Sequence, residues 1–174
     1  MTIPQQKFRE LVFQYLYSQD MSQTESDDLV ELLMKQLSVP KKAVREAGTR
    51  VEKILEVIEE IDQRIRDTST SYDFNRIPRV ERNVLRLGIF ELFHDDLIPP
   101  KVAISEAIRL SRKFSSSQSA SFVNAILDQL YKKSIGEKID EEEIVATAEE
   151  LEKLEEISNE AAKEQESSDL SDIL

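Results

Sequence analysis

Apolar residues recur at spacings of three and four along most of this chain. Within residues 5–19 they fall on one helical face, as Phe8, Leu11, Val12, Tyr15 and Leu16. This 3.6-residue period predicts amphipathic helices with a buried stripe. The same pattern, interrupted by segments rich in proline, glycine or serine, predicts helices at residues 5–19, 24–37, 40–67, 78–93, 101–113, 119–133 and 140–163.

The segment 78–93 differs from the others because apolar residues almost surround it. A helix that is apolar on most of its faces is expected at the centre of a fold. The polar segment 67–73 precedes it and is poor in helix-forming residues, so we interpret this segment as the connection between two halves. The helices predicted at 5–19, 24–37 and 40–67 then form the first half.

The composition favours the same all-α class. Among 174 residues there are three glycines and five prolines, whereas a sheet protein of this size needs many tight turns rich in glycine. The chain has no cysteine, which excludes disulfides and thiolate metal ligands. No apolar run approaches the roughly 18 residues that span a bilayer, and the first residues lack the apolar core of a signal peptide. We expect a cytoplasmic protein without membrane association.

The acidic residues are concentrated towards the C-terminus. The formal net charge is −12, and residues 137–174 hold 15 of the 35 acidic residues but 3 of the 23 basic ones. Residues 1–136 are therefore balanced in charge and can still carry a basic surface patch. Asp140 and Glu143 form a capping-box pattern that predicts a helix start. The apolar stripe of this last helix is thin and consists of Val145, Ala148, Leu151, Leu154 and Ile157.

We accordingly expect a domain at residues 1–136 and an acidic extension at residues 137–174 that is partly helical and disordered at its end. A mobile acidic extension could compete with RNA for a basic patch. The favoured interpretation is simpler: the thin stripe docks on the bundle, or the charges keep the protein soluble.

Residue types that carry catalysis or bind metals are nearly absent. The chain has no glycine-rich phosphate loop and a single histidine, His94. His94 precedes two aspartates and is expected at a solvent-exposed helix end. The carboxylates lie in helical charge patterns, which indicates solvated faces. The sequence therefore predicts no enzyme, no metal site and no cofactor.

Four arginines, Arg76, Arg79, Arg82 and Arg86, follow one helical flank at spacings of three and four. They either bind phosphate or pair with nearby acids while their stems pack on the core. The second interpretation is favoured because the helix is otherwise so apolar.

Other basic residues lie near the ends of predicted helices, at Lys7, Arg9, Arg112 and Lys113. Aromatic residues interleave with them, at Phe8, Tyr17, Phe114 and Phe122. This combination suits single-stranded RNA, which is held by phosphate contacts and by base stacking. For each aromatic ring taken alone, burial in the core is the more common outcome.

Three consecutive segments of the second half carry distinctive motifs. They read IPRVERNVLRLGIFELF, then IPPKVAISEAIRLSRKF, then SASFVNAILDQL, and the N-terminal region contains FRELVFQYLYSQD. In their order, residue identities and spacing, these segments resemble the NusB family, over about residues 5–135. The acidic extension has no counterpart in this resemblance.

The resemblance implies an all-helical fold of two three-helix units packed around a shared core. It further implies a transcription antitermination factor that binds boxA RNA of ribosomal RNA transcripts with the ribosomal protein NusE, so that RNA polymerase reads through terminators. Carried over by position, the RNA-binding residues are Lys7, Arg9, Tyr17, Lys113, Gln118 and Phe122. Glu81 would offer its carboxylate to a basic side chain of NusE. Some family members dimerise, so the resemblance also allows a homodimer.

The start of the chain departs from the family pattern. Family members commonly open with an arginine-rich string, whereas this chain has Pro4-Gln-Gln-Lys-Phe-Arg9, with two cations. Each lost phosphate contact is expected to weaken RNA binding and to lower the logarithmic salt slope by about 0.7. Gln118 stands where some relatives carry an acid, which removes one repulsion from phosphate.

Two other functions compete with antitermination. A helical module that binds only protein is consistent with the few arginines and the acidic extension. An accessory domain of a ribosomal RNA cytosine methyltransferase would have a similar fold. It is disfavoured because no glycine-rich cofactor domain and no catalytic cysteine follow in the chain.

Overall fold

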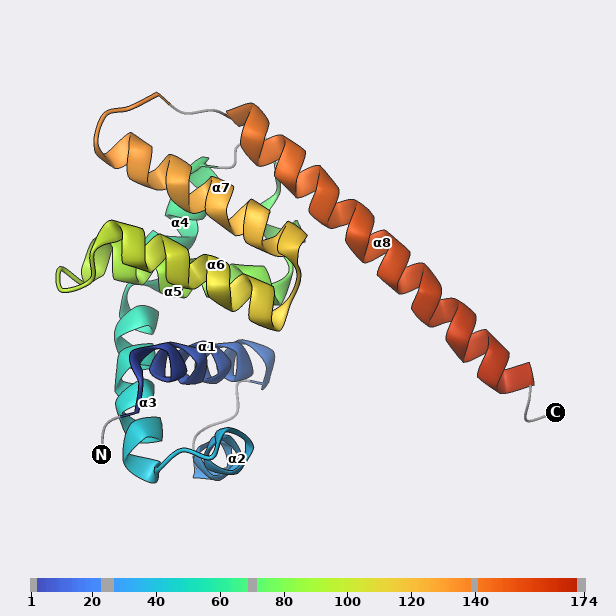
Figure 1. Cartoon of the computed structure of the whole chain (residues 1–174), viewed down its shortest axis with the longest axis horizontal. Helices are drawn as coiled ribbons and strands as arrows, with labels where there is room; N and C mark the ends of the chain where they lie inside the picture. The colour runs from blue at the N-terminus through green and yellow to red at the C-terminus, as the bar shows by residue number, and fades with distance from the viewer. Residues whose placement is uncertain (1–2, 23–26, 69–71, 139–140, 172–174) are drawn as a thin grey trace.

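The computed structural model describes residues 3–22, 27–68, 72–138 and 141–171, which contain α-helices, one 3₁₀ turn and no strand (Figure 1). The predicted all-α class is thus confirmed. The elements are α1 (Gln5–Ser22), α2 (Asp27–Leu37), α3 (Lys41–Glu56), α4 (Ile58–Thr68), η1 (Phe74–Arg76), α5 (Arg79–His94), α6 (Pro100–Phe114), α7 (Ser117–Ser134) and α8 (Glu141–Ser171).

The predicted single helix at 40–67 is wrong in one respect, because it is broken at Val57 into α3 and α4. Val57 has φ −115° and ψ 15°, and its N–H donates to the carbonyl of Ile54 at 3.2 Å. The helix resumes when Ile61 N–H donates to the Val57 carbonyl at 3.0 Å. α3 packs on α1 and α2, whereas α4 packs on α5 and α7. The break lets one apolar stripe contribute to both halves of the protein.

The two three-helix units expected from the sequence are α1–α3 and α5–α7, and α4, which connects them in sequence, packs on α5 and α7 of the second unit (Figure 1). As predicted, α5 is the central helix, since it contacts α1, α3, α4, α6 and α7. Gly88 allows close approach of α6 and α7 to this helix. A Cβ atom there would lie 3.1 Å from Leu127 Cδ1 and 3.2 Å from Ala107 Cβ, so a side chain at this position would force these neighbours to shift by a few tenths of an ångström.

Two helical glycines are expected to respond oppositely to replacement by alanine. In Gly48→Ala the added Cβ would lie 3.4 Å from Tyr15 Oη, an ordinary contact. The higher helix propensity of alanine should then raise the free energy of unfolding by about 0.5–1 kcal/mol. In Gly88→Ala the crowding against Ala107 outweighs that gain, and we expect a loss of about 1 kcal/mol. Urea denaturation of the two variants tests this, and equal stabilisation by both would contradict the close packing at Gly88.

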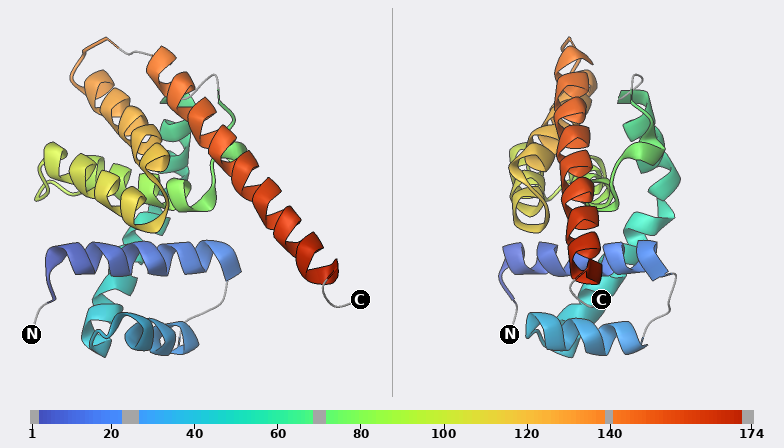
Figure 2. Two further views of the ribbon diagram at one scale, coloured as in Figure 1. Left: turned by 45° about the vertical axis from the view of Figure 1, so that its right-hand side comes forward. Right: turned by 90° about the vertical axis from the view of Figure 1, so that its right-hand side faces the viewer.

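α7 ends at Ser134, and Gly136, two residues later, has a φ of +80°. α8 begins at Glu141. Its first half packs on α7 through the buried side chains of Ile144, Ala148 and Leu151. Its second half extends beyond the other helices (Figure 2). Of the predicted stripe, Ala148 and Leu151 are buried, Val145 and Leu154 are half-buried, and Ile157 is 64% exposed, so the stripe docks only in its first part and with Ile144 added. α8 is helical as far as Ser171, and residues 172–174, at the end expected to be disordered, lie outside the described residues. Among the described residues, no helix is long and apolar enough to cross a membrane.

Candidate RNA and partner surface

α1 and α6 lie side by side and are joined by ion pairs that follow both helices in the same direction. Arg109 Nη1 contacts Glu10 Oε1 at 2.6 Å, and Arg109 Nη2 donates to the carbonyl of Gln6 at 3.1 Å. One turn later along α6, Lys113 Nζ contacts Glu10 Oε2 at 2.7 Å. These contacts place the C-terminal end of α6 next to the middle of α1, where the sequence predicts RNA-binding residues.

An aromatic cluster continues this surface. The ring of Phe13 lies 4.8 Å from that of Phe114 and 6.0 Å from that of Tyr17, measured between centroids. Tyr17 and Phe114 are half-buried, so part of each ring faces solvent. The structure therefore brings Tyr17 and Lys113, which are distant in sequence, to the same end of the α1 and α6 pair.

α7 begins at this same end and carries Gln118 in its first turn. Ser116 caps the helix by accepting a hydrogen bond from Ser119 N–H at 3.1 Å, and no acidic residue occupies the first turn. A helix N-terminus without acids attracts anions, because its backbone N–H groups and dipole favour negative charge. Gln118 is half-buried here. Lys113, at the end of α6, and Gln118 thus flank the start of α7, and Tyr17 follows them through its ring contact with Phe13, which packs on Phe114.

The two other predicted basic residues, both in α1, differ sharply in their surroundings. Lys7 is half-buried in the first turn and has no ion pair within the described part of the chain. Arg9 is 8% exposed, and its Nε lies 2.8 Å from Glu91 Oε1. The expectation that Arg9 is an exposed phosphate ligand is therefore wrong in this conformation. The helical period gives the reason, since Arg9 shares its face with the buried side chains of Phe13 and Leu16.

Phe122 also requires a correction. Its side chain is 0% exposed, and its ring centroid lies 5.8 Å from that of Tyr72 in an edge-on arrangement. The ring offers no free face to a base. The signal was present in the sequence, because Phe122 and the fully buried Ile126 lie four residues apart on the inner stripe of α7.

Glu81, the predicted contact for NusE, lies in the first turn of α5 and is only 2% exposed. Its Oε1 accepts a hydrogen bond from Ser115 Oγ at 2.7 Å. Ser115 belongs to the connection between α6 and α7, which also leads to Gln118. The predicted protein-binding residue and the predicted RNA-binding residues are thus neighbours across this short connection.

A cavity of about 480 Å³ lies next to Glu81. Its walls come from α5, the α6–α7 connection and α8, through Pro78, Val80, Glu81, Ser115, Ser116, Leu151, Leu154, Glu155, Ser158 and Asn159. Burial raises the pKa of Glu155, and the negative charges of Glu81 and Glu152 raise it further. Carboxylates from α5 and α8 therefore face each other at this cavity.

Three of the four arginines of the flank are engaged within the fold, as the favoured interpretation held, whereas Arg79 is exposed and donates to Met21 Sδ. Arg86 forms a buried two-pronged ion pair with Asp62 of α4, with Nε–Oδ1 at 2.8 Å and Nη2–Oδ2 at 2.7 Å. The guanidinium of Arg82 lies 5.0 Å from the centroid of the Phe74 ring. Arg76 forms an ion pair with Glu152 of α8. The flank thus connects α5 and η1 to their neighbours.

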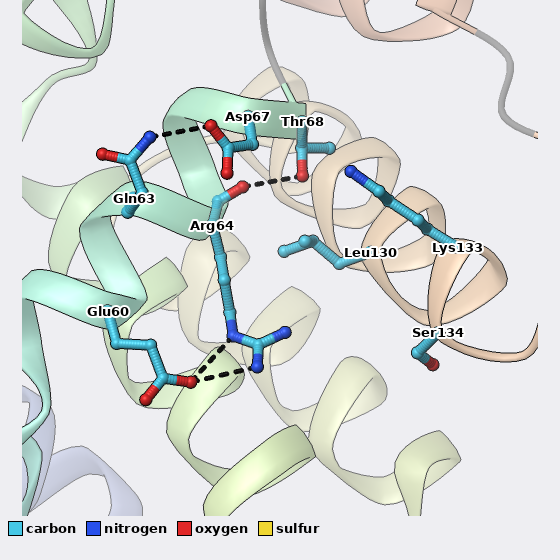
Figure 3. A pocket seen from close by; sticks show the side chains of 8 residues that line it. All are labelled: Glu60, Gln63, Arg64, Asp67, Thr68, Leu130, Lys133 and Ser134. Carbon is cyan, nitrogen blue, oxygen red and sulfur yellow. Dashed lines mark hydrogen bonds and ion pairs between the residues drawn. The ribbon is translucent and has the colours of Figure 1, made fainter.

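A polar groove between α4 and α7 offers no chemistry of its own (Figure 3). Its side chains are already paired along α4: Arg64 donates to Glu60 at 3.1 and 3.0 Å, and Gln63 donates to Asp67 at 2.7 Å. Nearby, the partly buried His94 ends α5 with Nε2 3.5 Å from Glu60. Across the described residues, no group of histidine and acidic side chains is arranged to hold a metal ion.

Comparison with known proteins places the chain in a family. Residues 6–132 match the NusB family. The transcription antitermination protein NusB of Chlamydia pneumoniae is 42% identical over 131 residues, which cover 75% of this chain and 82% of the relative. That of Dehalococcoides mccartyi (strain CBDB1) is 32% identical over 132 residues, which cover 76% and 92%. These relatives are transcription factors, which agrees with the prediction that the chain is not an enzyme.

Solved structures give the same result. NusB of T. maritima superposes with a TM-score of 0.64 at 32% identity, over 76% of this chain and 94% of that one. A NusB bound to NusE and double-stranded RNA superposes with a TM-score of 0.64 at 28% identity, over 74% and 96%. The family match ends before α8 begins. The chain belongs to the NusB family.

Proposed function

We propose that this protein is a cytoplasmic antitermination factor. It binds boxA RNA of ribosomal RNA operon transcripts together with NusE and helps RNA polymerase read through terminators. The observation that carries the proposal is that Lys113 and Gln118 lie at the two ends of the α6–α7 connection, with Tyr17 linked to Phe114 of α6 through Phe13 and with Glu81 bonded to Ser115 of the connection. The similar NusB bound to NusE and RNA supports the same pair of partners.

The RNA surface combines a stacking ring with a small number of cations. Tyr17 offers a partly exposed ring to a base, and base stacking on an aromatic is worth about 1–3 kcal/mol. Lys113 must exchange the Glu10 carboxylate for a phosphate. Burial raises the pKa of Glu10, but hydrogen bonds from Lys113 and Arg109 outweigh this and hold it below its ordinary value. With Lys7 and Lys113 as the two cations that contact phosphate, we expect a logarithmic salt slope of only about 1.4.

The protein surface is centred on Glu81. A carboxylate that accepts one hydrogen bond from Ser115 keeps the capacity to accept a cationic donor from a partner. A basic side chain of NusE would neutralise the charge of Glu81. On this proposal, residues 1–136 bind RNA and NusE, and residues 137–174 form an acidic extension.

The test is a titration of labelled boxA RNA with the full chain, with and without NusE. We expect the wild type to bind RNA more tightly when NusE is present. Lys113→Gln should weaken RNA binding and lower the salt slope by about 0.7. Glu81→Lys should impair NusE binding more than RNA binding by the isolated protein, because the residue lies on the protein-binding side.

The matched control is Lys42→Gln on α3, an exposed lysine with only a loose contact to Glu46. It should leave both affinities unchanged. If NusE binds but RNA does not bind under any of these conditions, the chain is a module that binds only protein, and the RNA part of the proposal is wrong. Equal NusE affinity of the wild type and Glu81→Lys would contradict the role of Glu81.

A further inference from the structure

We infer that α8 is an intramolecular cover of the groove beside Glu81, and that a basic segment of a protein partner must displace α8 to bind there. The inference rests on the proposed function, because it concerns access to the protein-binding surface. The groove lies between the start of α5 and the α6–α7 connection, and α8 forms its remaining wall. In the described structure, α8 therefore occupies one side of the proposed partner site.

The cover is held mainly at its N-terminal half. Ile144, Ala148 and Leu151 are each no more than 2% exposed and pack on the α7 side of the bundle. Glu152 adds an ion pair with Arg76 of η1. Burial of three apolar side chains is a sufficient driving force for docking a helix. The residues from 156 to 163 are exposed, and this part of α8 leads away from the other helices (Figure 2).

The covered groove encloses the carboxylate that a partner would need. Glu81 is 2% exposed, and the cavity beside it is closed on one side by Leu151, Leu154 and Glu155 of α8. α8 is therefore the wall that a partner segment approaching Glu81 from this side would have to replace. While α8 stays docked, a partner segment cannot lie along this side of Glu81.

Electrostatics makes this cover displaceable by a basic partner in particular. α8 places Glu155 beside the same groove as Glu81, and burial together with the charges of Glu81 and Glu152 raises the pKa of Glu155. At this end of the groove, Arg76 of η1 forms an ion pair with Glu152. Docking therefore includes a repulsion between Glu81 and Glu155, which a lysine or arginine from outside would replace by an attraction. An RNA strand would gain nothing here, since phosphate would meet carboxylates.

The experiment compares release variants of the full chain with a matched control. Leu151→Asp and Ala148→Glu each put a charge into the buried face of α8. Ile157→Asp adds the same charge to the same helix at a side chain that is 64% exposed. Amide hydrogen exchange of residues 144–151 reports whether α8 is released, and circular dichroism melting reports whether the rest remains folded.

We expect both release variants to bind purified NusE about tenfold more tightly than the wild type. The reason is that only molecules with an uncovered groove bind, so the apparent affinity of the wild type is lowered in proportion to that open fraction. Ile157→Asp should match the wild type. Glu155→Gln removes the repulsion from Glu81 without entering the buried face, so it should strengthen docking and weaken NusE binding. It tests the inference even if the release variants fold poorly.

The outcomes separate the inference from the proposed function. If release of α8 leaves NusE affinity at the wild-type value, or if Glu155→Gln has no effect on it, then α8 is not a cover and the inference is overturned while NusE binding stands. If neither the wild type nor any released form binds NusE, the proposed function fails and the inference fails with it. Tighter RNA binding after release, with NusE affinity unchanged, would assign α8 to the RNA surface instead and also overturn the inference.

Discussion

Replacement of Arg9 by alanine is expected to lower the free energy of unfolding by about 3–5 kcal/mol, the usual loss when one partner of a buried ion pair is removed. Arg9 Nε lies 2.8 Å from Glu91 Oε1 and 3.2 Å from Oε2, and Nη1 lies 3.9 Å from Glu106. Burial raises the pKa of Glu91, and the opposing charge of Arg9 only partly offsets it. Without Arg9, Glu91 would be a buried carboxylate whose remaining cationic neighbour, Arg50, is engaged elsewhere.

Urea denaturation at neutral pH measures this loss, and Lys7→Ala is the control two residues earlier on α1. Lys7 is not held in an ion pair of this kind, so its replacement should change stability by less than about 0.5 kcal/mol. The double variant Arg9→Met, Glu91→Leu should recover most of the loss, because apolar residues of similar size can replace a buried pair. A loss below about 1 kcal/mol in Arg9→Ala would contradict the buried pair. If the prediction holds, weakened RNA binding in an Arg9 variant is evidence about folding and not about phosphate contact.

A second large effect is expected for Arg86→Ala. The guanidinium joins three helices, because it contacts Asp62 of α4 at 2.7 and 2.8 Å, Asp20 of α1 at 3.5 Å and Asn83 of α5 at 3.3 Å. Burial lowers the pKa of Arg86, but the two aspartates outweigh it and hold the pKa above its ordinary value. Its removal leaves Asp62 buried without a cation, and we expect a loss of about 3–5 kcal/mol.

The control for Arg86 is Lys42→Ala, which removes an exposed partner of Glu46 within one helix and should cost less than about 0.5 kcal/mol. Arg86→Met combined with Asp62→Leu should restore part of the stability, while Asn83 continues to donate to Asp20 at 3.0 Å. If the single variant unfolds at the same urea concentration as the wild type, the network does not hold α4 against α5. Hydrogen exchange in α4 distinguishes local detachment from global loss.

The helices of this protein follow from short-range patterns. The 3.6-residue period located α1, α2, α5, α6 and α7 to within a few residues, and the apolar surround of α5 predicted its central place. These features are local, because a helix needs only its own hydrogen bonds and one apolar face. The motifs between Ile77 and Leu130 were likewise sufficient to indicate the NusB family, since they are contiguous in the chain.

The break at Val57 depended on tertiary structure. The apolar stripe from Val44 to Ile65 continues without interruption, so nothing in its period indicates a bend. The bend follows from packing, because the first part of the stripe must face α1 and the second part must face α5 and α7. A straight helix could not satisfy both surfaces.

The candidate site was only partly predictable from the sequence for the same reason. The family resemblance indicated Tyr17, Lys113, Gln118 and Glu81 by their positions in the sequence. Only the tertiary structure showed how they lie relative to the α6–α7 connection. The burial of Arg9 depends on Glu91, which lies 82 positions away, and the covering of Glu81 depends on α8, which begins 60 residues later. Periodicity tells which face of a helix is apolar. It cannot tell which long charged side chain meets a partner across the fold, because that depends on the relative placement of helices that are distant in sequence.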